Sequence, residues 1–298
     1  MIELRGILAP VATPFTGDGE LDESAFAANA RAHLAAGLHG IVVTGSTGEA
    51  ALLDESERLR LVEIARKEIG SHQLLIVGTG AESTRGVILR NRAIADRGAD
   101  AVLVVAPHYY SGAMTNEALR EHYTRVADAS PVPVLIYTIP KYMHFAVPPE
   151  LVRELAAHEN IVGMKDSSGD AKLFAGYMEA RSDRFHVMTG SAGLLAEALR
   201  MGADGAILAA ALFAPALSLE VMEVALAGDI ARTNAAQAKL APLGSRIVGA
   251  MGVPGVKAAL DLIGLRGGEP RLPLLPLDST LLGEVRELLA GAGLAARG

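Results

Sequence analysis

A lysine at the end of an apolar run is the residue of this sequence best placed to do chemistry. Lys165 follows the apolar residues 161–164, so we expect its side chain to leave a buried strand where an ammonium group is poorly solvated. Desolvation favours the uncharged amine, and an uncharged amine can attack a carbonyl carbon to form a Schiff base. A lysine paired with a carboxylate such as Asp166 or Glu49 is the structural alternative, and position alone leaves both open.

Few other lysines compete for this role. The chain has six lysines, and three of them, Lys67, Lys172 and Lys239, fall on amphipathic stretches that predict solvent-exposed helix faces. Lys141 and Lys257 lie in loop or helix-start contexts. A reaction that requires a lysine therefore points to Lys165.

A tyrosine ends the preceding apolar run. Tyr137 follows residues 134–136, and adjacent parallel strands would place it beside Lys165. A phenol at that distance can carry protons to and from the carbonyl group that forms the imine. A buried aromatic residue with a hydrogen-bonded hydroxyl is the alternative reading of Tyr137.

A glycine-rich turn follows an earlier apolar run, with the sequence Gly45-Ser46-Thr47-Gly48-Glu49. Glycines let the backbone approach a ligand, and free N–H groups at the start of a helix favour an anion such as a carboxylate. The spacing is not that of a P-loop or a dinucleotide fingerprint. A simple tight turn is the alternative.

The composition excludes several other kinds of chemistry. The 298 residues include no cysteine, which rules out a disulfide scaffold, a thiol nucleophile, a zinc ribbon and an iron–sulfur cluster. The net charge of −7 and the absence of a basic run argue against binding to nucleic-acid phosphates. The eight histidines show no metal-ligand spacing, so we expect no metal site. With neither a secretory signal pattern nor a membrane-spanning apolar stretch, we expect a cytoplasmic protein.

Eight short apolar runs, each followed by a longer amphipathic stretch, predict strands that alternate with helices. Near-continuous apolar strands between helices indicate a parallel sheet covered on both faces. Eight such units in about 220 residues is the size of a closed (β/α)8 TIM barrel, and a doubly wound sheet is the alternative. The predicted strands cover residues 6–10, 41–44, 74–78, 101–106, 134–138, 161–165, 186–189 and 206–209.

Local signals place helix starts and the end of the barrel. Asp22 and Asp54 precede amphipathic stretches, and Glu57 completes a capping box with Asp54. The strand pattern stops after residue 228. We therefore predict an α/β barrel over residues 1–228 and a C-terminal helical extension over residues 229–298, with helices over residues 230–249, 253–263 and 278–290.

Active sites of this fold lie at the carboxyl ends of the strands, so the polar residues that follow the predicted strands share one rim. These residues are Thr13, Ser46, Thr47, Glu49, Thr79, His108, Tyr109, Tyr110, Tyr137, Thr138, Lys165, Asp166, Ser167, Ser168, Thr189, Gly190 and Ser191, together with the region of Ile207.

The motifs on this rim resemble, in type and order, those of one enzyme superfamily. The sequence runs GSTGE, PHYY, YTIP, GMKDSSGD, GSAG and GADGAIL, over nearly the whole chain. This set is similar to the pyruvate-dependent class I aldolases of the dihydrodipicolinate synthase and N-acetylneuraminate lyase superfamily. Neither GSTGE nor YxxP alone would be specific, whereas the combination is.

The resemblance implies a role for each motif residue. Lys165 would form the Schiff base with the keto carbon, Tyr137 would transfer protons, and Ser46 would link Tyr137 to Tyr109, a tyrosine that reaches in from a neighbouring subunit. Such a tyrosine implies a homotetramer built from dimers, and the chemistry requires no cofactor. The expected substrate-binding residues are Ser46 and Thr47 at the pyruvate carboxylate, Ser167 and Gly190 near the substrate, and Ile207 closing the pocket.

The loop after the YTIP element bears on the substrate. Dihydrodipicolinate synthases carry an arginine there that binds the carboxylate of the aldehyde, whereas this chain has Tyr142 at that position and no arginine over residues 126–152. The loss of a bidentate carboxylate clamp argues against that activity, although Lys141 could partly compensate. The positions of the feedback site for lysine also differ, so we expect no feedback by lysine; they hold Glu55, Arg58, Glu82 and Gly86.

Three longer segments look more like 4-hydroxy-2-oxoglutarate aldolases: those that begin YYSGAM, IVGMKD and GVPGVK. We therefore expect a lyase that cleaves a 4-hydroxy-2-oxo acid, such as 4-hydroxy-2-oxoglutarate, to pyruvate and an aldehyde. Condensation of pyruvate with aspartate semialdehyde and dehydration of a 2-oxo sugar acid are the enzymatic alternatives. A barrel that only binds 2-oxo acids is the non-enzymatic alternative, but binding alone needs no Schiff-base lysine.

Overall fold

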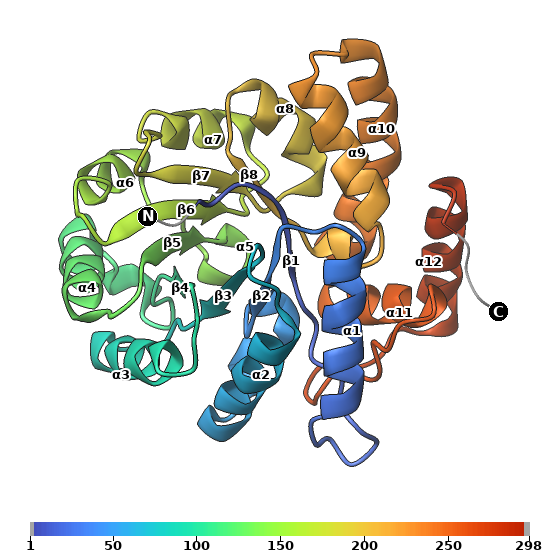
Figure 1. Cartoon of the computed structure of the whole chain (residues 1–298), viewed down its shortest axis with the longest axis horizontal. Helices are drawn as coiled ribbons and strands as arrows, with labels where there is room; N and C mark the ends of the chain where they lie inside the picture. The colour runs from blue at the N-terminus through green and yellow to red at the C-terminus, as the bar shows by residue number, and fades with distance from the viewer. Residues whose placement is uncertain (1–2, 295–298) are drawn as a thin grey trace.

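Eight parallel strands close into a barrel in chain order, from β1 to β8 and back to β1 (Figure 1). The computed structural model describes residues 3–294 of the chain. The predicted (β/α)8 barrel is confirmed, and the doubly wound sheet is excluded because β8 pairs with β1. The strands are β1 (Gly6–Pro10), β2 (Gly40–Val43), β3 (Leu74–Gly78), β4 (Ala101–Val105), β5 (Val134–Thr138), β6 (Ile161–Asp166), β7 (His186–Thr189) and β8 (Gly205–Ile207).

Helices surround the strands as the alternating pattern predicts (Figure 1). Asp22 caps α1 by accepting the N–H of Ala25, and Asp54 and Glu57 form the predicted capping box of α2. The helices of the barrel are α1 (Glu23–Ala35), α2 (Glu55–Glu68), α3 (Thr84–Ala95), α4 (Asn116–Ala129), α5 (Pro140–Met143), α6 (Pro149–Leu155), α7 (Ala171–Met178), α8 (Leu195–Arg200) and α9 (Pro215–Leu226). Short 3₁₀ turns cover Ser46–Gly48, Ala50–Leu52, Ser111–Ala113, Ala192–Leu194 and Ala209–Leu212.

The strand register places the two candidate catalytic side chains side by side. Tyr137 of β5 pairs directly with Lys165 of β6, two residues beyond a register shift between Val134 and Leu135. Every residue of β5 is buried, as expected for a strand covered on both faces. The barrel therefore presents both side chains at its carboxyl end.

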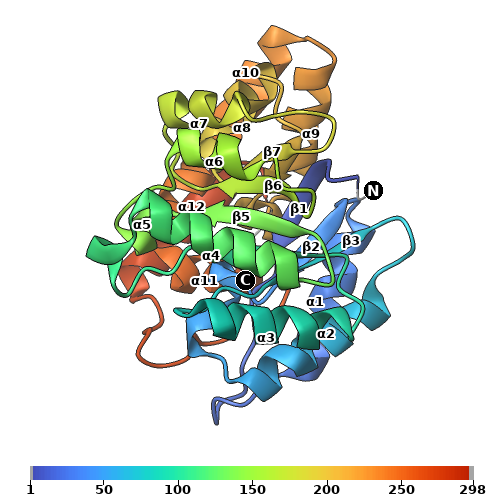
Figure 2. The same cartoon turned by 90° about the vertical axis from the view of Figure 1, so that its left-hand side faces the viewer.

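The C-terminal extension packs on the barrel. It consists of α10 (Ile230–Pro242), a π-helical segment (Leu243–Ala250), α11 (Gly252–Leu262) and α12 (Ser279–Gly291). Leu240, Ile247 and Leu260 of the extension share one buried apolar cluster with Ile7 of β1 and Ala206 of β8. Figure 2 shows α11 and α5 on the same side of the barrel. The boundary at residue 228 stays a prediction.

None of the helices within residues 3–294 combines the length and the apolar character that crossing a membrane requires.

Candidate active site

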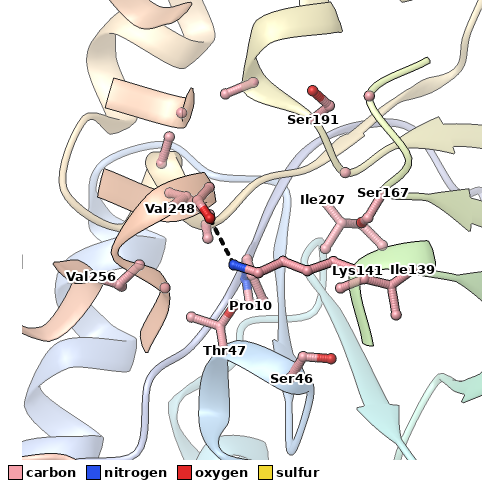
Figure 3. A pocket seen from close by; sticks show the side chains of 18 of the residues that line it. Pro10, Ser46, Thr47, Ile139, Lys141, Ser167, Ser191, Ile207, Val248 and Val256 are labelled. Carbon is pink, nitrogen blue, oxygen red and sulfur yellow. Dashed lines mark hydrogen bonds between the residues drawn. The ribbon is translucent and has the colours of Figure 1, made fainter. Parts of the chain in front are cut away.

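A cavity of about 310 Å³ lies at the carboxyl end of the barrel (Figure 3). Seven of the eight site residues predicted from the sequence line it: Ser46, Thr47, Tyr137, Lys165, Ser167, Gly190 and Ile207. They come from the ends of β5, β6 and β8 and from the segments that follow β2, β6 and β7. The structure therefore gathers residues that span more than half of the sequence into one site.

Lys165 is the most enclosed charged side chain of this cavity. Its side chain is 6% exposed, and its Nζ lies 4.4 Å from the centre of the Tyr137 ring. In the part of the chain that the structure describes, no carboxylate lies within ion-pair distance of Nζ. The alternative in which Lys165 pairs with Asp166 or Glu49 is wrong, because Asp166 accepts hydrogen bonds from Ser168 and Glu49 pairs with Lys257.

Tyr137 is 4% exposed and lies against the lysine. Its hydroxyl accepts a long hydrogen bond, 3.4 Å, from Oγ of Ser167. Ser46 lines the same cavity, and its link to Tyr137 stays a prediction. The neighbouring Ser167 hydroxyl gives the phenol a partner for proton transfer within its own chain.

Gly190 has a steric reason to lack a side chain. A Cβ atom at this position would lie 2.8 Å from Cε of Lys165 and would also collide with Oγ of Ser167. A larger residue would therefore displace the lysine and the serine together. Gly190 lines the cavity, and its place near the substrate stays a prediction.

The turn after β2 borders the cavity. Its internal hydrogen bonds use the N–H groups of Gly48, Glu49 and Ala50. The N–H groups of Ser46 and Thr47 have no partner among residues 3–294, and both residues line the cavity. Unpaired N–H groups at the start of a helical turn attract an anion such as a carboxylate.

Asp166 is a buried carboxyl group beside the site. Ser168 donates to it twice, from its N–H at 2.9 Å and from its hydroxyl at 2.8 Å. Burial raises the pKa of Asp166 to about 6, and these hydrogen bonds oppose the rise. Asp166 does not line the cavity, so we assign it the ordering of the Ser167–Ser168 segment.

Tyr109 is the predicted site residue that does not reach the cavity of its own chain. It follows β4, and its side chain is 76% exposed, in edge contact with the ring of Tyr110. Its backbone N–H donates to Glu82. Its action in a neighbouring subunit stays a prediction.

The C-terminal extension forms a wall of the cavity that sequence reasoning missed. The π-helical segment contributes Ser245, Val248 and Gly249, and α11 contributes Val253 and Val256. A helical pattern after the eighth strand was the only signal in the sequence, and it did not indicate which face meets the barrel mouth.

Two further lysines form polar contacts in the region of the cavity. Lys141 of α5 lines the cavity and donates from Nζ to the carbonyl oxygen of Gly249 at 2.7 Å, which Figure 3 shows as a dashed line. Lys257 was expected in a loop or at a helix start, and that prediction is wrong. It lies within α11 and is 1% exposed. Its buried ammonium group pairs with Glu49.

Comparison with known proteins gives consistent matches over nearly the whole chain. The model of the dihydrodipicolinate synthetase family matches residues 3–292. A 4-hydroxy-tetrahydrodipicolinate synthase of Stenotrophomonas maltophilia is 38% identical over 280 residues, which are 94% of this chain and 93% of that protein. A protein of the same name from Methanoculleus marisnigri is 34% identical over 293 residues, 97% of this chain and 99% of that protein.

Solved structures agree with these relatives. The dihydrodipicolinate synthase of Acinetobacter baumannii in complex with pyruvate has a TM-score of 0.92 and 32% identity, and the match covers 98% of this chain and 99% of that one. YagE of Escherichia coli K12, also in complex with pyruvate, has a TM-score of 0.92 and 28% identity, with coverage of 99% and 100%.

Proposed function

The chain belongs to the dihydrodipicolinate synthetase family of pyruvate-dependent, carbon–carbon bond-forming and bond-cleaving enzymes, and we propose that Lys165 is its Schiff-base nucleophile. One observation carries this proposal: the amine of a buried lysine, free of any carboxylate partner within residues 3–294, opens into the cavity beside a tyrosine. In the reaction that we propose, a 4-hydroxy-2-oxo acid is reversibly cleaved to pyruvate and an aldehyde.

The steps follow from the chemistry of an amine and a ketone. The Lys165 amine adds to the C2 carbonyl, and loss of water from the carbinolamine gives a protonated imine. A base removes the proton of the C4 hydroxyl, the C3–C4 bond breaks, and its electron pair enters the imine system as an enamine. The aldehyde leaves. Protonation of the enamine at C3 and hydrolysis of the imine then release pyruvate and restore the lysine.

The cavity supplies the other groups that these steps need. Tyr137, with Ser167 as its hydrogen-bond partner, would move protons during formation and hydrolysis of the carbinolamine. The free N–H groups of Ser46 and Thr47 would hold the carboxylate next to the keto group. Ile207 would pack against the methyl side of pyruvate.

The charge of the cavity supports an aldehyde that carries an anionic group. Lys141 and Lys165 line the cavity, and none of its described lining residues is an aspartate or a glutamate. Once Lys165 is consumed by the imine, Lys141 is the lysine left to meet a second carboxylate. We therefore propose 4-hydroxy-2-oxoglutarate as the substrate and glyoxylate as the aldehyde product.

Condensation of pyruvate with aspartate semialdehyde is the second candidate. The names of the relatives described above favour it, since both are 4-hydroxy-tetrahydrodipicolinate synthases. Tyr142, which lines the cavity at the position where such synthases carry an arginine, speaks for the first candidate.

A substrate panel separates the two. Purified protein is assayed for pyruvate release from 4-hydroxy-2-oxoglutarate and for pyruvate consumption with glyoxylate or aspartate semialdehyde. We expect a higher kcat/KM with glyoxylate than with aspartate semialdehyde. The reverse ranking would transfer the assignment to the second candidate.

We also propose that the chain forms a homotetramer in which Tyr109 completes the site of a neighbouring subunit. The exposure of Tyr109 and Tyr110, at 76% and 69%, supports this, because large aromatic side chains are enriched at interfaces. One solved neighbour is described as a monomeric dihydrodipicolinate synthase variant, so a monomer is the alternative to the tetramer. Light scattering on the purified protein gives the mass directly.

A further inference from the structure

A buried ion pair joins the C-terminal extension to the turn after β2. Nζ of Lys257, on α11, lies 2.6 Å from Oε1 of Glu49, and the two side chains are 1% and 0% exposed. The other carboxylate oxygen of Glu49 accepts the backbone N–H of Arg271 at 2.8 Å. Lys257 also donates to the carbonyl oxygen of Glu269 and lies 4.5 Å from the centre of the Phe15 ring. Both charges are therefore fully partnered by the extension and the barrel.

The turn that this pair holds has a strained backbone. Thr44 and Glu49 flank the segment that carries Ser46 and Thr47, and both have left-handed backbone angles, with φ of 53° and 56°. Non-glycine residues keep such angles only where the surroundings enforce them. Each is anchored by its side chain: Thr44 Oγ1 donates to the carbonyl oxygen of Gly78 at 2.8 Å, and Glu49 is held by Lys257.

The same helix borders the cavity. Val253 and Val256 of α11 line it together with Thr47 of the turn, and Figure 3 shows Val256 and Thr47 at the cavity. A shift of α11 would therefore move a wall of the cavity and the anchor of the turn together.

Stability alone is a weak explanation for this pair. Taking two charges out of water is costly, and apolar residues of similar volume often stabilise a protein as well or better. An ion pair differs from apolar packing in fixing the orientation of the groups that carry it. The orientation fixed here is that of Glu49, which ends the turn.

We propose that the Glu49–Lys257 pair is a positioning device that holds the N–H groups of Ser46 and Thr47 where they bind the carboxylate of the 2-oxo acid, so that pyruvate affinity depends on the C-terminal extension. The inference rests on the proposed function, since it assumes that pyruvate forms its imine on Lys165. Glu49 and Lys257 touch no reacting atom in this scheme. They act through the turn.

The test removes both charges of the pair in the full-length chain. In the double variant Glu49→Gln/Lys257→Met, glutamine keeps an acceptor for the N–H of Arg271. The readout is the pyruvate concentration that gives half-maximal borohydride trapping on Lys165, measured by mass spectrometry, together with KM and kcat. We expect this concentration and the KM for pyruvate to rise at least tenfold, while kcat at saturating pyruvate and the KM for the aldehyde stay within threefold.

A second ion pair of the extension provides the matched control. Arg246 of the π-helical segment and Glu284 of α12 form a two-pronged pair at 2.6 and 3.0 Å that does not touch the turn. The variant Arg246→Met/Glu284→Gln should leave the half-saturating pyruvate concentration within twofold of that of the parent. Thermal unfolding of both double variants shows whether they fold.

The outcomes separate a failure of the positioning role from a failure of the proposed function. If the folded Glu49→Gln/Lys257→Met variant binds pyruvate as the parent does, or loses only kcat, the positioning role is overturned while the Schiff base stands. If the parent traps no pyruvate on Lys165, the proposed function fails and this inference fails with it. Should the double variant not fold, Glu49→Gln alone is measured against the same expectation, because the buried lysine can then lose its proton.

Discussion

Tyr137 and Lys165 face each other because the register of β5 and β6 pairs them directly. The contact between the amine and the ring, 4.4 Å from Nζ to the ring centre, places the phenol beside the amine that would react with the carbonyl in the proposed mechanism. A phenol in this position can act as acid and base in turn, which is what formation and hydrolysis of an imine require. Its role can be separated from its packing by removing the hydroxyl alone.

The variant Tyr137→Phe should lower kcat by about 100-fold or more, because general acid–base catalysis contributes a factor of this order. Tyr123→Phe is the control, since Tyr123 is also buried and its hydroxyl donates to the carbonyl oxygen of Val104 at 3.1 Å, away from the cavity. That variant should unfold more easily but keep its kcat. Equal kcat values for Tyr137→Phe and the parent would remove Tyr137 from the mechanism.

Lys141 should discriminate between charged and uncharged aldehydes. The variant Lys141→Ala should lower kcat/KM for glyoxylate by about tenfold, the scale of one hydrogen bond to a charged group, and change kcat/KM for glycolaldehyde less than threefold. Lys172→Ala, at an exposed position on α7, should affect neither. An equal loss of kcat/KM with both aldehydes would mean that Lys141 supports the cavity wall and does not discriminate between aldehydes by charge.

The carboxyl ends of the strands were predictable, whereas the wall built by the extension was not. Apolar runs mark strands because both faces of a parallel sheet are buried, and this placed Lys165 and Tyr137 correctly. The eighth strand was expected over residues 206–209 but ends at Ile207, and a 3₁₀ turn begins at Ala209. The π-helical segment lies within and just beyond the helix expected over residues 230–249, because a wide helical turn depends on packing that no local pattern encodes.

The burial and pairing of Lys257 are a second feature that the sequence did not predict. Its apolar neighbours Val256 and Ala258 could have indicated burial, but its partner Glu49 lies 208 residues away. A single sequence carries no signal for such a pair. Tyr109 is a third case, since its predicted role requires a second copy of the chain.

Close packing between the π-helical segment and α11 predicts a stability effect. A Cβ atom on Gly255 would lie 2.6 Å from the carbonyl oxygen of Ile247 and 2.6 Å from Cβ of Met251. Gly255→Ala should therefore lower the free energy of unfolding by about 1–3 kcal/mol, the usual cost of overpacking. Gly283→Ala on α12, where a Cβ atom meets nothing within 4 Å, should leave stability equal or slightly higher. Urea unfolding measures both, and equal stability of the two variants would contradict the packing described for α11.

Buried histidines contribute to the response of the protein to acid. Burial lowers the pKa of His33 and of His122 to about 4, from a usual value of 6.5. An unfolded histidine takes up a proton below pH 6.5 whereas the buried rings stay neutral, so stability is lost as the pH falls from 6.5 towards 4. Each ring accounts for about 3 kcal/mol of that loss. Asp166 acts in the opposite direction, because its raised pKa, about 6, makes its burial less costly at low pH.

The variant His33→Leu isolates one of these contributions. Nε2 of His33 has no partner among the described residues, so leucine can replace the ring without breaking a hydrogen bond at that atom. The drop in the free energy of unfolding between pH 7 and pH 4.5 should be smaller in this variant than in the parent, by about 2.5 kcal/mol. Urea unfolding at the two pH values measures it. An unchanged drop would show that His33 is not held neutral in the fold.

The central claim is that Lys165 forms a covalent imine with pyruvate. The direct measurement is mass spectrometry of peptides after incubation of the protein with pyruvate and borohydride, with Lys165→Ala as the control. We predict one reduced pyruvate adduct, located on Lys165, and neither adduct nor turnover in Lys165→Ala. An unmodified Lys165 peptide in protein that retains full activity would contradict the account.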